Sequence, residues 1–289
     1  MIVGVVGLGS IGKRHARNLL AMGHAITGFD IMPSAGLELG INVSDCLGFQ
    51  SCDAVVIASP TNEHSHGALR AIRDRKHVFI EKPMAASLAQ AEEIMEDARY
   101  YDRTVMVGNN MRYHPVVKLV KERMFELGGP YISAWFMLKQ KNTKYTDPVI
   151  LNWGAHEADL ALYLLDKKLG VMEGLSEVSQ DEAKFVLRNG SGPPVHIHLD
   201  YLMEPQERSF AIHGPDASIH GDLENFVVHI FGNQGREIIA VEGSHDQTYV
   251  EEMEEFIRRV EGKPSDGIGA TGEDGLRCLK LLLEAQNGI

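Results

Sequence analysis

The chain has 289 residues, of which 44% are hydrophobic and 24% charged, a composition typical of a globular protein with room for two domains. Its formal net charge of −12 argues against a nucleic-acid partner and against an anionic membrane, because both require a basic face. We therefore expect no nucleic acid and no membrane among its partners.

The cysteines and the start of the chain indicate a cytoplasmic location. Cys46, Cys52 and Cys278 form no CxxC pair and no even set, so we expect reduced thiols. An apolar strand already begins at Ile2, which leaves no room for a signal peptide, and no apolar run is long enough to cross a bilayer.

Up to about Tyr113 the sequence alternates apolar runs with amphipathic helical stretches. The expected elements are strand 2–6, helix 11–22, strand 25–29, strand 54–58, helix 63–74, strand 77–80, helix 87–101 and strand 104–107. Alternation of this kind predicts a parallel sheet with helices on both faces.

A glycine-rich turn joins the first strand to the first helix. Gly7 would permit the tight turn, Gly9 would let the backbone approach a pyrophosphate, and Gly12 would let the helix pack on the strand. The helix N-terminus, including Ser10 and Ile11, would hold the phosphate charge. The pattern therefore predicts a dinucleotide site.

Asp30 ends the strand at 25–29, 18 residues after Gly12. A carboxylate there can accept hydrogen bonds from the ribose hydroxyls and would repel a 2'-phosphate, so it favours NAD over NADP. The alternative is a solvated acid at the end of a strand.

The turn after the strand at 54–58 is expected to cover part of the dinucleotide, through Ser59, Pro60, Thr61 and His64. Pro60 would stiffen the turn, and Thr61 and Asn62 can cap the next helix. Capping alone explains Asn62 equally well, and His64 can be a packed or solvated histidine.

The strand at 77–80 ends in Glu81-Lys82-Pro83. A lysine at the mouth of a nucleotide-binding sheet is poorly explained as a solvated charge. An ammonium there can stabilise a developing alkoxide or polarise a carbonyl toward hydride acceptance. Lys82 is therefore a candidate catalytic residue, and Glu81 and Lys82 are also candidates for the cofactor site, while Pro83 makes a cis bond possible.

The periodicity changes after Tyr113. A helix near 114–127, a strand at 131–140 and a buried helix at 155–165 precede a run of short strands, expected at 171–178, 182–188, 194–202, 208–213, 217–221, 225–231 and 236–241. Turn residues separate these strands, which predicts an antiparallel sheet. Two helices near 247–260 and 273–287 close the chain.

Together these patterns predict an α/β Rossmann nucleotide-binding domain at 1–113. An α+β domain at 114–289, with a large, mainly antiparallel open sheet, would follow and would serve substrate binding and oligomerisation. Exposed apolar positions on that sheet would form the contact of a homodimer or homotetramer. His196 and His198 are interpreted as residues of the sheet surface, and no metal is predicted.

Five segments in order resemble the glucose-fructose oxidoreductase / inositol 2-dehydrogenase / rhizopine catabolism (Gfo/Idh/MocA) family. They are the glycine-rich turn, the turn at 59–64, Glu81-Lys82-Pro83, the segment 107–115 and the segment 152–160. The last two helices are similar as well. The resemblance implies an NAD-dependent oxidoreductase that interconverts a secondary hydroxyl and a ketone on a sugar, sugar nucleotide or polyol by hydride transfer.

The resemblance also implies roles for residues of the second half. His156 would exchange a proton with the substrate hydroxyl while Lys82 supports it. Asn152, His156 and Asp159 have spacings that could place them on one side of a helix, and all three are candidates for substrate binding. Asp159 can equally be structural, and Glu157 is expected to face away. Arg112 and Tyr113 could contact substrate or stabilise the domain junction.

One position departs from the family pattern. Asn152 stands where the family commonly has an aspartate, and an amide can hydrogen-bond to a hydroxyl but cannot accept its proton. Proton transfer would therefore depend on His156 and Lys82. Two alternatives stay open, namely an NAD-binding regulator of the same fold without turnover and a redox-neutral, NAD-assisted sugar conversion.

Overall fold

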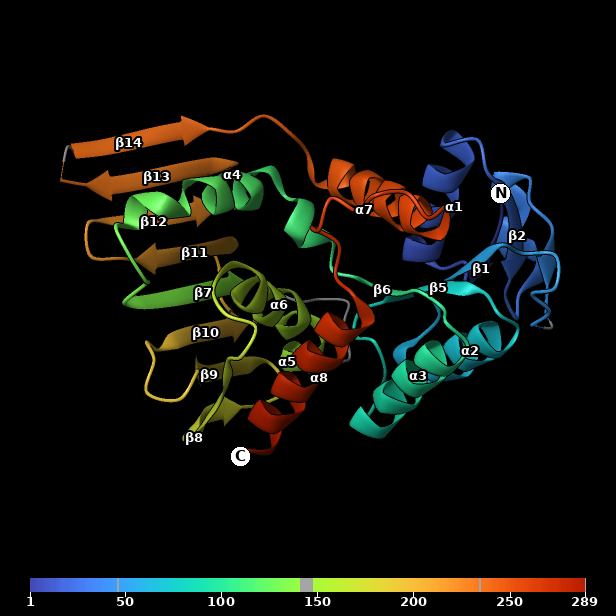
Figure 1. Ribbon diagram of the computed structural model, residues 1–289, viewed down its shortest axis with the longest axis horizontal. Coiled ribbons are helices and arrows are strands. Elements are labelled where there is room, and N and C mark those ends of the chain that lie inside the picture. Colours follow the sequence, from blue (N-terminus) through green and yellow to red (C-terminus); the bar gives the residue numbers. More distant parts are fainter. Residues whose placement is uncertain (46, 141–147, 234, 289) are drawn as a thin grey trace. The chain divides into compact units, whose positions relative to one another are not determined.

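The computed structural model describes residues 1–45, 47–140, 148–233 and 235–288, and the chain forms two compact units (Figure 1). The first unit contains Met1–Asn110 and Asp246–Leu279, and the second contains Met111–His245 and the residues from Lys280 on. The boundary expected at 113 assigned 246–279 to the second domain, whereas this stretch belongs to the first unit.

The first unit is built on a parallel sheet of six strands in the order β3-β2-β1-β4-β5-β6. The strands are β1 (Ile2–Val6), β2 (Ala25–Phe29), β3 (Val43–Ser44), β4 (Ala54–Ile57), β5 (His77–Glu81) and β6 (Val105–Gly108). Every residue of β4 and β6 is buried, as expected for strands that are covered on both faces. The α/β Rossmann prediction for this part of the chain is confirmed.

Helices cover both faces of this sheet (Figure 1). Helices α1 (Ser10–Ala21) and α7 (His245–Val260) lie on one face, and α2 (Thr61–Arg73) and α3 (Leu88–Tyr100) lie on the other. The short 3-10 helix η1 (Pro33–Leu39) and the two-residue strand β3 were not expected, because neither has a periodic pattern long enough to predict it.

Helix α7 joins the first unit through its apolar face. Met253, Phe256 and Ile257 belong to the same buried cluster as Phe79 of β5 and Met106 of β6. The rings of Phe79 and Phe256 meet edge to face with centroids 5.7 Å apart. This burial explains why a helix late in the sequence returns to the nucleotide-binding sheet.

The second unit contains an eight-stranded sheet in the order β14-β13-β12-β11-β7-β10-β9-β8. Its strands are β7 (Ser133–Lys139), β8 (Gly170–Val178), β9 (Glu182–Arg188), β10 (Val195–Asp200), β11 (Glu207–His213), β12 (Ala217–Asp222), β13 (Val227–Gly232) and β14 (Gly235–Ala240). All neighbours pair antiparallel except β7 and β10, which are parallel. The prediction of a large, mainly antiparallel open sheet is confirmed.

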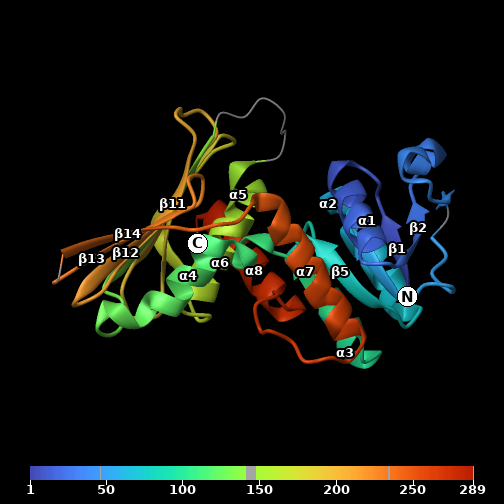
Figure 2. The ribbon, with the colours of Figure 1, turned by 90° about the horizontal axis from the view of Figure 1, so that it is seen from above.

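The helices of this unit lie on one face of the sheet (Figure 2). They are α4 (Pro115–Arg123), the 3-10 helix η3 (Met124–Leu127), α5 (Val149–Asn152), α6 (Gly154–Leu164) and the end of α8 (Gly272–Asn287). Residues of β7 alternate between buried and half-buried, so one face of the strand packs on these helices. Among the described helices, none is long and apolar enough to cross a membrane.

His114 links the stability of the second unit to pH. Its ring is fully buried beside Phe226 and His245, and its Nδ1 accepts a hydrogen bond from the Val116 N–H at the start of α4. Burial, aided by the nearby charges of His245 and Arg208, lowers the pKa of His114 to about 3.

We expect the free energy of unfolding to fall as the pH decreases below about 6.5, the ordinary histidine pKa, because the unfolded chain then binds a proton that the folded chain excludes. This group alone contributes up to about 1.4 kcal/mol per pH unit until the folded pKa is reached. His114→Asn keeps an acceptor for Val116 and removes the titration. Urea unfolding at several pH values between 7 and 4 gives the free energy of unfolding as a function of pH. This free energy should fall less steeply with decreasing pH in the variant, and an equally steep fall in both proteins would contradict the assignment.

Candidate active site

The glycine-rich turn leaves no room for side chains at two of its three glycines. Gly7 has φ +82°, and a Cβ there would lie 2.6 Å from the Ser59 backbone. A Cβ on Gly12 would lie 1.8 Å from the Gly7 carbonyl oxygen. These two glycines are therefore fixed by close packing of β1, α1 and the turn after β4.

Gly9 differs from both, because a Cβ built on it meets no atom within 4 Å. It precedes Ser10, the first residue of α1, where the first N–H groups have no partner inside the helix. An open approach to a helix N-terminus is the arrangement that a pyrophosphate requires. The turn, including Ser10 and Ile11, therefore fits a dinucleotide.

Asp30 lies beside this turn. Its Oδ2 accepts a hydrogen bond from the Leu8 N–H at 2.7 Å, and its Oδ1 accepts one from the Met32 N–H at 2.9 Å. The carboxylate is thereby held at the end of β2, next to the glycines, in the position from which it could reach a ribose.

Two buried polar atoms near the same strand ends have no hydrogen-bond partner among the described residues. They are Oγ of Ser59, shortly after β4, and Oδ1 of Asn109, directly after β6. Because β4, β5 and β6 are neighbouring parallel strands, both residues follow the same edge of the sheet as Lys82. Buried polar groups normally have partners, so these atoms fit a polar ligand. Sequence reasoning missed Asn109, although its place after an apolar strand could have indicated it.

Glu81 is 7% exposed and has two contacts that orient it. Its Oε1 lies 2.6 Å from Nε2 of His15 on α1, and its Oε2 accepts the Lys82 N–H at 3.2 Å. Burial would raise the pKa of Glu81, but the hydrogen bond and charge of His15, with the charges of Lys82 and His64, lower it below its usual range. The peptide bond from Lys82 to Pro83 is cis.

His64 of α2 connects two of the turns at this edge. Its Nε2 lies 2.8 Å from the Ser59 carbonyl oxygen, and its Nδ1 lies 3.0 Å from the Pro83 carbonyl oxygen. Burial lowers the pKa of His64 despite these two acceptors. The structure therefore gives His64 a packing and connecting role, while contact of His64, Pro60 or Thr61 with a cofactor stays a prediction.

In the second unit, Asn152 and His156 lie on either side of a break between two helices. Asn152 is the last residue of α5, and its Nδ2 donates to the Tyr201 hydroxyl at 2.9 Å. His156 lies in the first turn of α6, and its N–H donates to the Trp153 carbonyl at 3.0 Å. Helix α5 was not expected, so the two side chains are carried by two short helices instead of one.

Arg112 and Asp159 bind each other. Nε of Arg112 lies 2.8 Å from Oδ2 of Asp159, and Nη2 lies 2.6 Å from Oδ1, so the pair is bidentate. Both residues are 1% exposed, and the guanidinium lies over the Tyr163 ring. These contacts give both a structural role, and their predicted contact with substrate stays a prediction, as does that of the buried Tyr113.

Glu157 is fully buried against the sheet. Its Oε1 accepts a hydrogen bond from Nε of Arg208 on β11 at 2.8 Å and forms an ion pair with Nη2 of the same residue at 2.7 Å. Burial raises the pKa of Glu157, and Arg208 only partly offsets this. The side chain thus points to the strands, which fits the expectation that it does not belong to the site.

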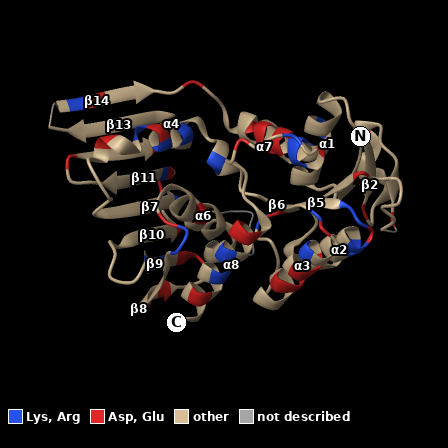
Figure 3. Ribbon diagram, viewed as in Figure 1, with Lys and Arg blue, Asp and Glu red and all other residues tan. Residues whose placement is uncertain are grey.

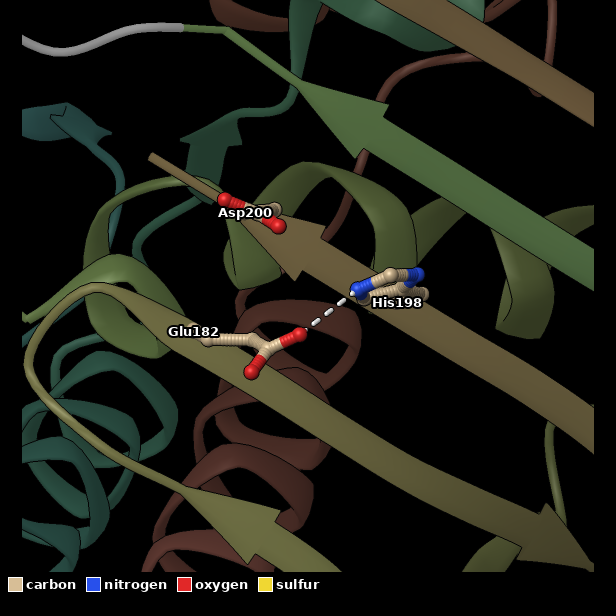
Figure 4. A group of neighbouring side chains, drawn as sticks. All are labelled: Glu182, His198 and Asp200. Atoms are coloured by element: carbon tan, nitrogen blue, oxygen red, sulfur yellow. Dashed lines mark hydrogen bonds and ion pairs between the residues drawn. The ribbon is translucent and has the colours of Figure 1, made fainter. Parts of the chain in front are cut away.

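The register of β9 and β10 brings three polar side chains together on the open face of the second sheet, Glu182, His198 and Asp200 (Figure 4). Glu182 pairs across β9 and β10 with Asp200, and Nε2 of His198 lies 3.2 Å from Oε1 of Glu182. The potential metal-ligand atoms of the three residues lie within 4.8 Å of one another. Each carboxylate also has a protein partner, since Lys184 binds Glu182 and backbone N–H groups bind Asp200. Sequence reasoning missed this group because it considered β10 alone.

Comparison with known proteins finds a family model that matches the first part of the chain. Residues 1–109 match the sequence model of the oxidoreductase family with an NAD-binding Rossmann fold, the Gfo/Idh/MocA family. The whole chain aligns with 96% of a myo-inositol 2-dehydrogenase from Thermotoga maritima at 25% identity. Both matches support the resemblance to the Gfo/Idh/MocA family.

Solved structures share the two-unit fold. UDP-N-acetylglucosamine 3-dehydrogenase from Acidithiobacillus ferrooxidans has a TM-score of 0.88 at 20% identity, covering 100% of this chain and 97% of that one. An oxidoreductase from Agrobacterium radiobacter, solved with NAD+, L-tartaric acid and magnesium, has a TM-score of 0.88 at 17% identity, covering 100% and 96%. These comparisons support an NAD-binding oxidoreductase that acts on CH–OH groups.

The contrast between Gly9 and Gly12 gives a direct test of the cofactor site. Gly9→Ala should leave the melting temperature of the apoprotein unchanged and weaken NAD binding, because its Cβ would enter open space reserved for the pyrophosphate. Gly12→Ala should destabilise the apoprotein by about 1–3 kcal/mol, the usual cost of overpacking. Thermal unfolding and calorimetric NAD titration measure both effects. If Gly9→Ala binds NAD as tightly as the unmodified protein, the dinucleotide does not lie against Gly9.

Proposed function

We propose that the protein interconverts a secondary hydroxyl and a ketone on a sugar, sugar nucleotide or polyol with NAD. The observation that carries this proposal is the open approach at Gly9, at the edge of the sheet where Lys82 follows β5. Relatives named for myo-inositol and for UDP-N-acetylglucosamine support the substrate class.

In this proposal NAD, when bound, takes up or returns the hydride of the carbinol carbon. The Lys82 ammonium stabilises the negative charge that develops on the substrate oxygen. His156 takes the proton that the hydroxyl loses on oxidation and returns it on reduction. Asn152 orients the hydroxyl through its amide, which can hydrogen-bond but cannot take the proton.

Asp30 supports NAD as the preferred cofactor. Its carboxylate is fixed by two backbone N–H groups at the end of β2. A carboxylate held in this way cannot easily turn away from a 2'-phosphate, and the repulsion would disfavour NADP.

A regulator of the same fold, binding NAD without turnover, is the second candidate. Asn152 favours it, because the residue removes a proton acceptor from the position where the family commonly has one. A redox-neutral sugar conversion is the third, and it would return the hydride to the product. Both predict bound NAD without net accumulation of NADH.

A panel of sugars, polyols and sugar nucleotides, followed by absorbance of reduced cofactor with NAD and NADP in parallel, tests the function. We expect saturable NADH formation with at least one member and little with NADP. Lys82→Ala should leave NAD binding largely intact and lose about 10²–10⁴-fold in kcat, the loss typical of a positioned acid, base or electrostatic group.

Lys263→Ala is the matched control for this variant, because Lys263 is an exposed lysine of the same unit. It should turn over like the unmodified protein. If Lys82→Ala keeps full activity, Lys82 has no part in the chemistry. If NAD binds tightly but no member of the panel reduces it, the regulator becomes the better explanation.

We also propose that the open face of the eight-stranded sheet forms a homodimer or homotetramer contact. Phe231 on β13 and Ile238 on β14 are 39% and 57% exposed, and the strand register places them on the face turned away from the buried residues Val228 and Ile230. Strand β13 carries no charged residue (Figure 3). Exposed apolar side chains on neighbouring strands of one sheet face are typical of a contact between subunits.

Light scattering after size exclusion tests the assembly. The unmodified protein should have the mass of a dimer or tetramer, and Ile238→Glu should shift it toward the monomer, because a buried charge without a partner opposes association. Leu37→Glu, at a residue of η1 that is 78% exposed, is the control and should not change the mass. A monomeric unmodified protein would refute this contact.

A further inference from the structure

His15 is a buried titratable residue that the proposed chemistry does not use. It lies on α1, the helix that starts at the glycine-rich turn, and it is 0% exposed. Its ring packs edge-on against Phe79 at 5.2 Å and against Tyr249 of α7 at 6.1 Å. Burying an imidazole among aromatic rings costs free energy unless its polar atoms are hydrogen-bonded.

The contact between His15 and Glu81 has a defined direction. Glu81 is held in its ionised form, and an ionised carboxylate can only accept, so Nε2 of His15 donates to Oε1. The separation of 2.6 Å is as short as in charge-assisted hydrogen bonds. Nδ1 of His15 has no hydrogen-bond partner among the described residues, so the ring is oriented by this one bond and by packing.

Glu81 transmits this contact to Lys82. Its other oxygen, Oε2, accepts the Lys82 backbone N–H at 3.2 Å. Gly108 on β6 leaves the space for the carboxylate, since a Cβ there would come within 3.1 Å of it. One carboxylate therefore bridges the cofactor helix and the lysine of the candidate site.

The charged and titratable groups that act on Glu81 come from three places. They are His15 from α1, His64 from α2, and Lys82 from its own segment. Burial alone would raise the pKa of Glu81, and the hydrogen bond and charge of His15 are the largest influences that lower it. Without His15, burial would be opposed only by the charges of Lys82 and His64, so the pKa of Glu81 would rise.

We propose that His15 is a positioning residue for the reaction, which acts through Glu81: its hydrogen bond keeps Glu81 a carboxylate, and this carboxylate keeps Lys82 an ammonium next to the substrate oxygen. The inference rests on the role proposed above for Lys82. In this proposal α1 has a second role besides binding the pyrophosphate, because His15 on the same helix sets the charge of Glu81 and Lys82.

Trace labelling of lysines with acetic anhydride tests this without turnover. Only the neutral amine reacts, so the labelling of Lys82 in the apoprotein, followed by mass spectrometry over a pH series, reports its protonation. In His15→Leu the pH of half-labelling of Lys82 should fall by at least about half a unit, because Glu81 loses its charge. Glu81→Gln should lower it as well, and His15→Leu should add nothing in the Glu81→Gln background.

Two further variants separate this effect from packing. His15→Gln keeps a donor near the place of Nε2 and should shift the half-labelling pH in the same direction by a smaller amount. This variant also replaces His15→Leu in the test if His15→Leu does not fold. His66→Gln makes the same substitution at an exposed histidine of α2 and should leave Lys82 unchanged. Lys76, in the same unit, is the internal reference for all variants.

Kinetics on an active substrate from the panel provide the second readout. His15→Leu should keep NAD affinity within about threefold and lose about tenfold or more in kcat. A loss of this size is typical when a group that supports proton transfer is removed. His15→Gln should recover most of it.

An unchanged or raised half-labelling pH for Lys82 in both His15 variants would overturn the inference. So would a shift by His15→Leu that is as large in the Glu81→Gln background as in the unmodified protein. These outcomes differ from failure of the proposed function. If no panel member is turned over, or Lys82→Ala is fully active, the chemistry proposed for the site is wrong, while the labelling still decides whether His15 acts on Lys82 through Glu81.

Discussion

The close approach of the β1–α1 turn to the end of β4 is the constraint on which the cofactor site depends. Gly12 has no space for a Cβ against the Gly7 carbonyl, and Gly7 has none against the Ser59 backbone. This packing brings the start of α1 to the sheet edge and leaves Gly9 facing open space. The same packing carries His15, one turn further along α1, to Glu81, so the proposed NAD site and the contact with the Glu81-Lys82 segment depend on the same helix.

Much of the fold was predictable because its elements have strong local patterns. The strands β1, β2 and β9 begin and end where the sequence predicted them, since each is an apolar or alternating run between turn residues. The glycines, Asp30 and Lys82 were predictable for a related reason, as each follows directly on such a strand. Position at a strand end is a local property, and it was enough to indicate the cofactor side of the site.

Long-range contacts could not be predicted from local patterns. The bidentate pair of Arg112 and Asp159 joins residues 47 positions apart, and the contact between His15 and Glu81 joins residues 66 apart. The placement of α7 with the first sheet depends on Phe256 reaching Phe79, which no local pattern reveals. Each of these contacts changed the interpretation of a residue: Arg112 and Asp159 gained structural roles, and His15 became a candidate for function.

The proposed function needs a charged group beside the substrate oxygen as well as a bound cofactor. A nucleotide-binding sheet can hold NAD with its glycines alone, whereas hydride transfer also needs a group that stabilises charge on the substrate oxygen. The buried Glu81, held by His15, supplies the surroundings in which Lys82 could do this.

Transfer of deuterium from substrate to NAD tests the proposed hydride transfer most directly. After incubation with a panel of sugars and polyols deuterated at their carbinol carbons, the NAD is analysed by mass spectrometry. We expect at least one member to deliver a single deuterium to NAD; tight NAD binding with no deuterium transferred from any member would contradict hydride transfer.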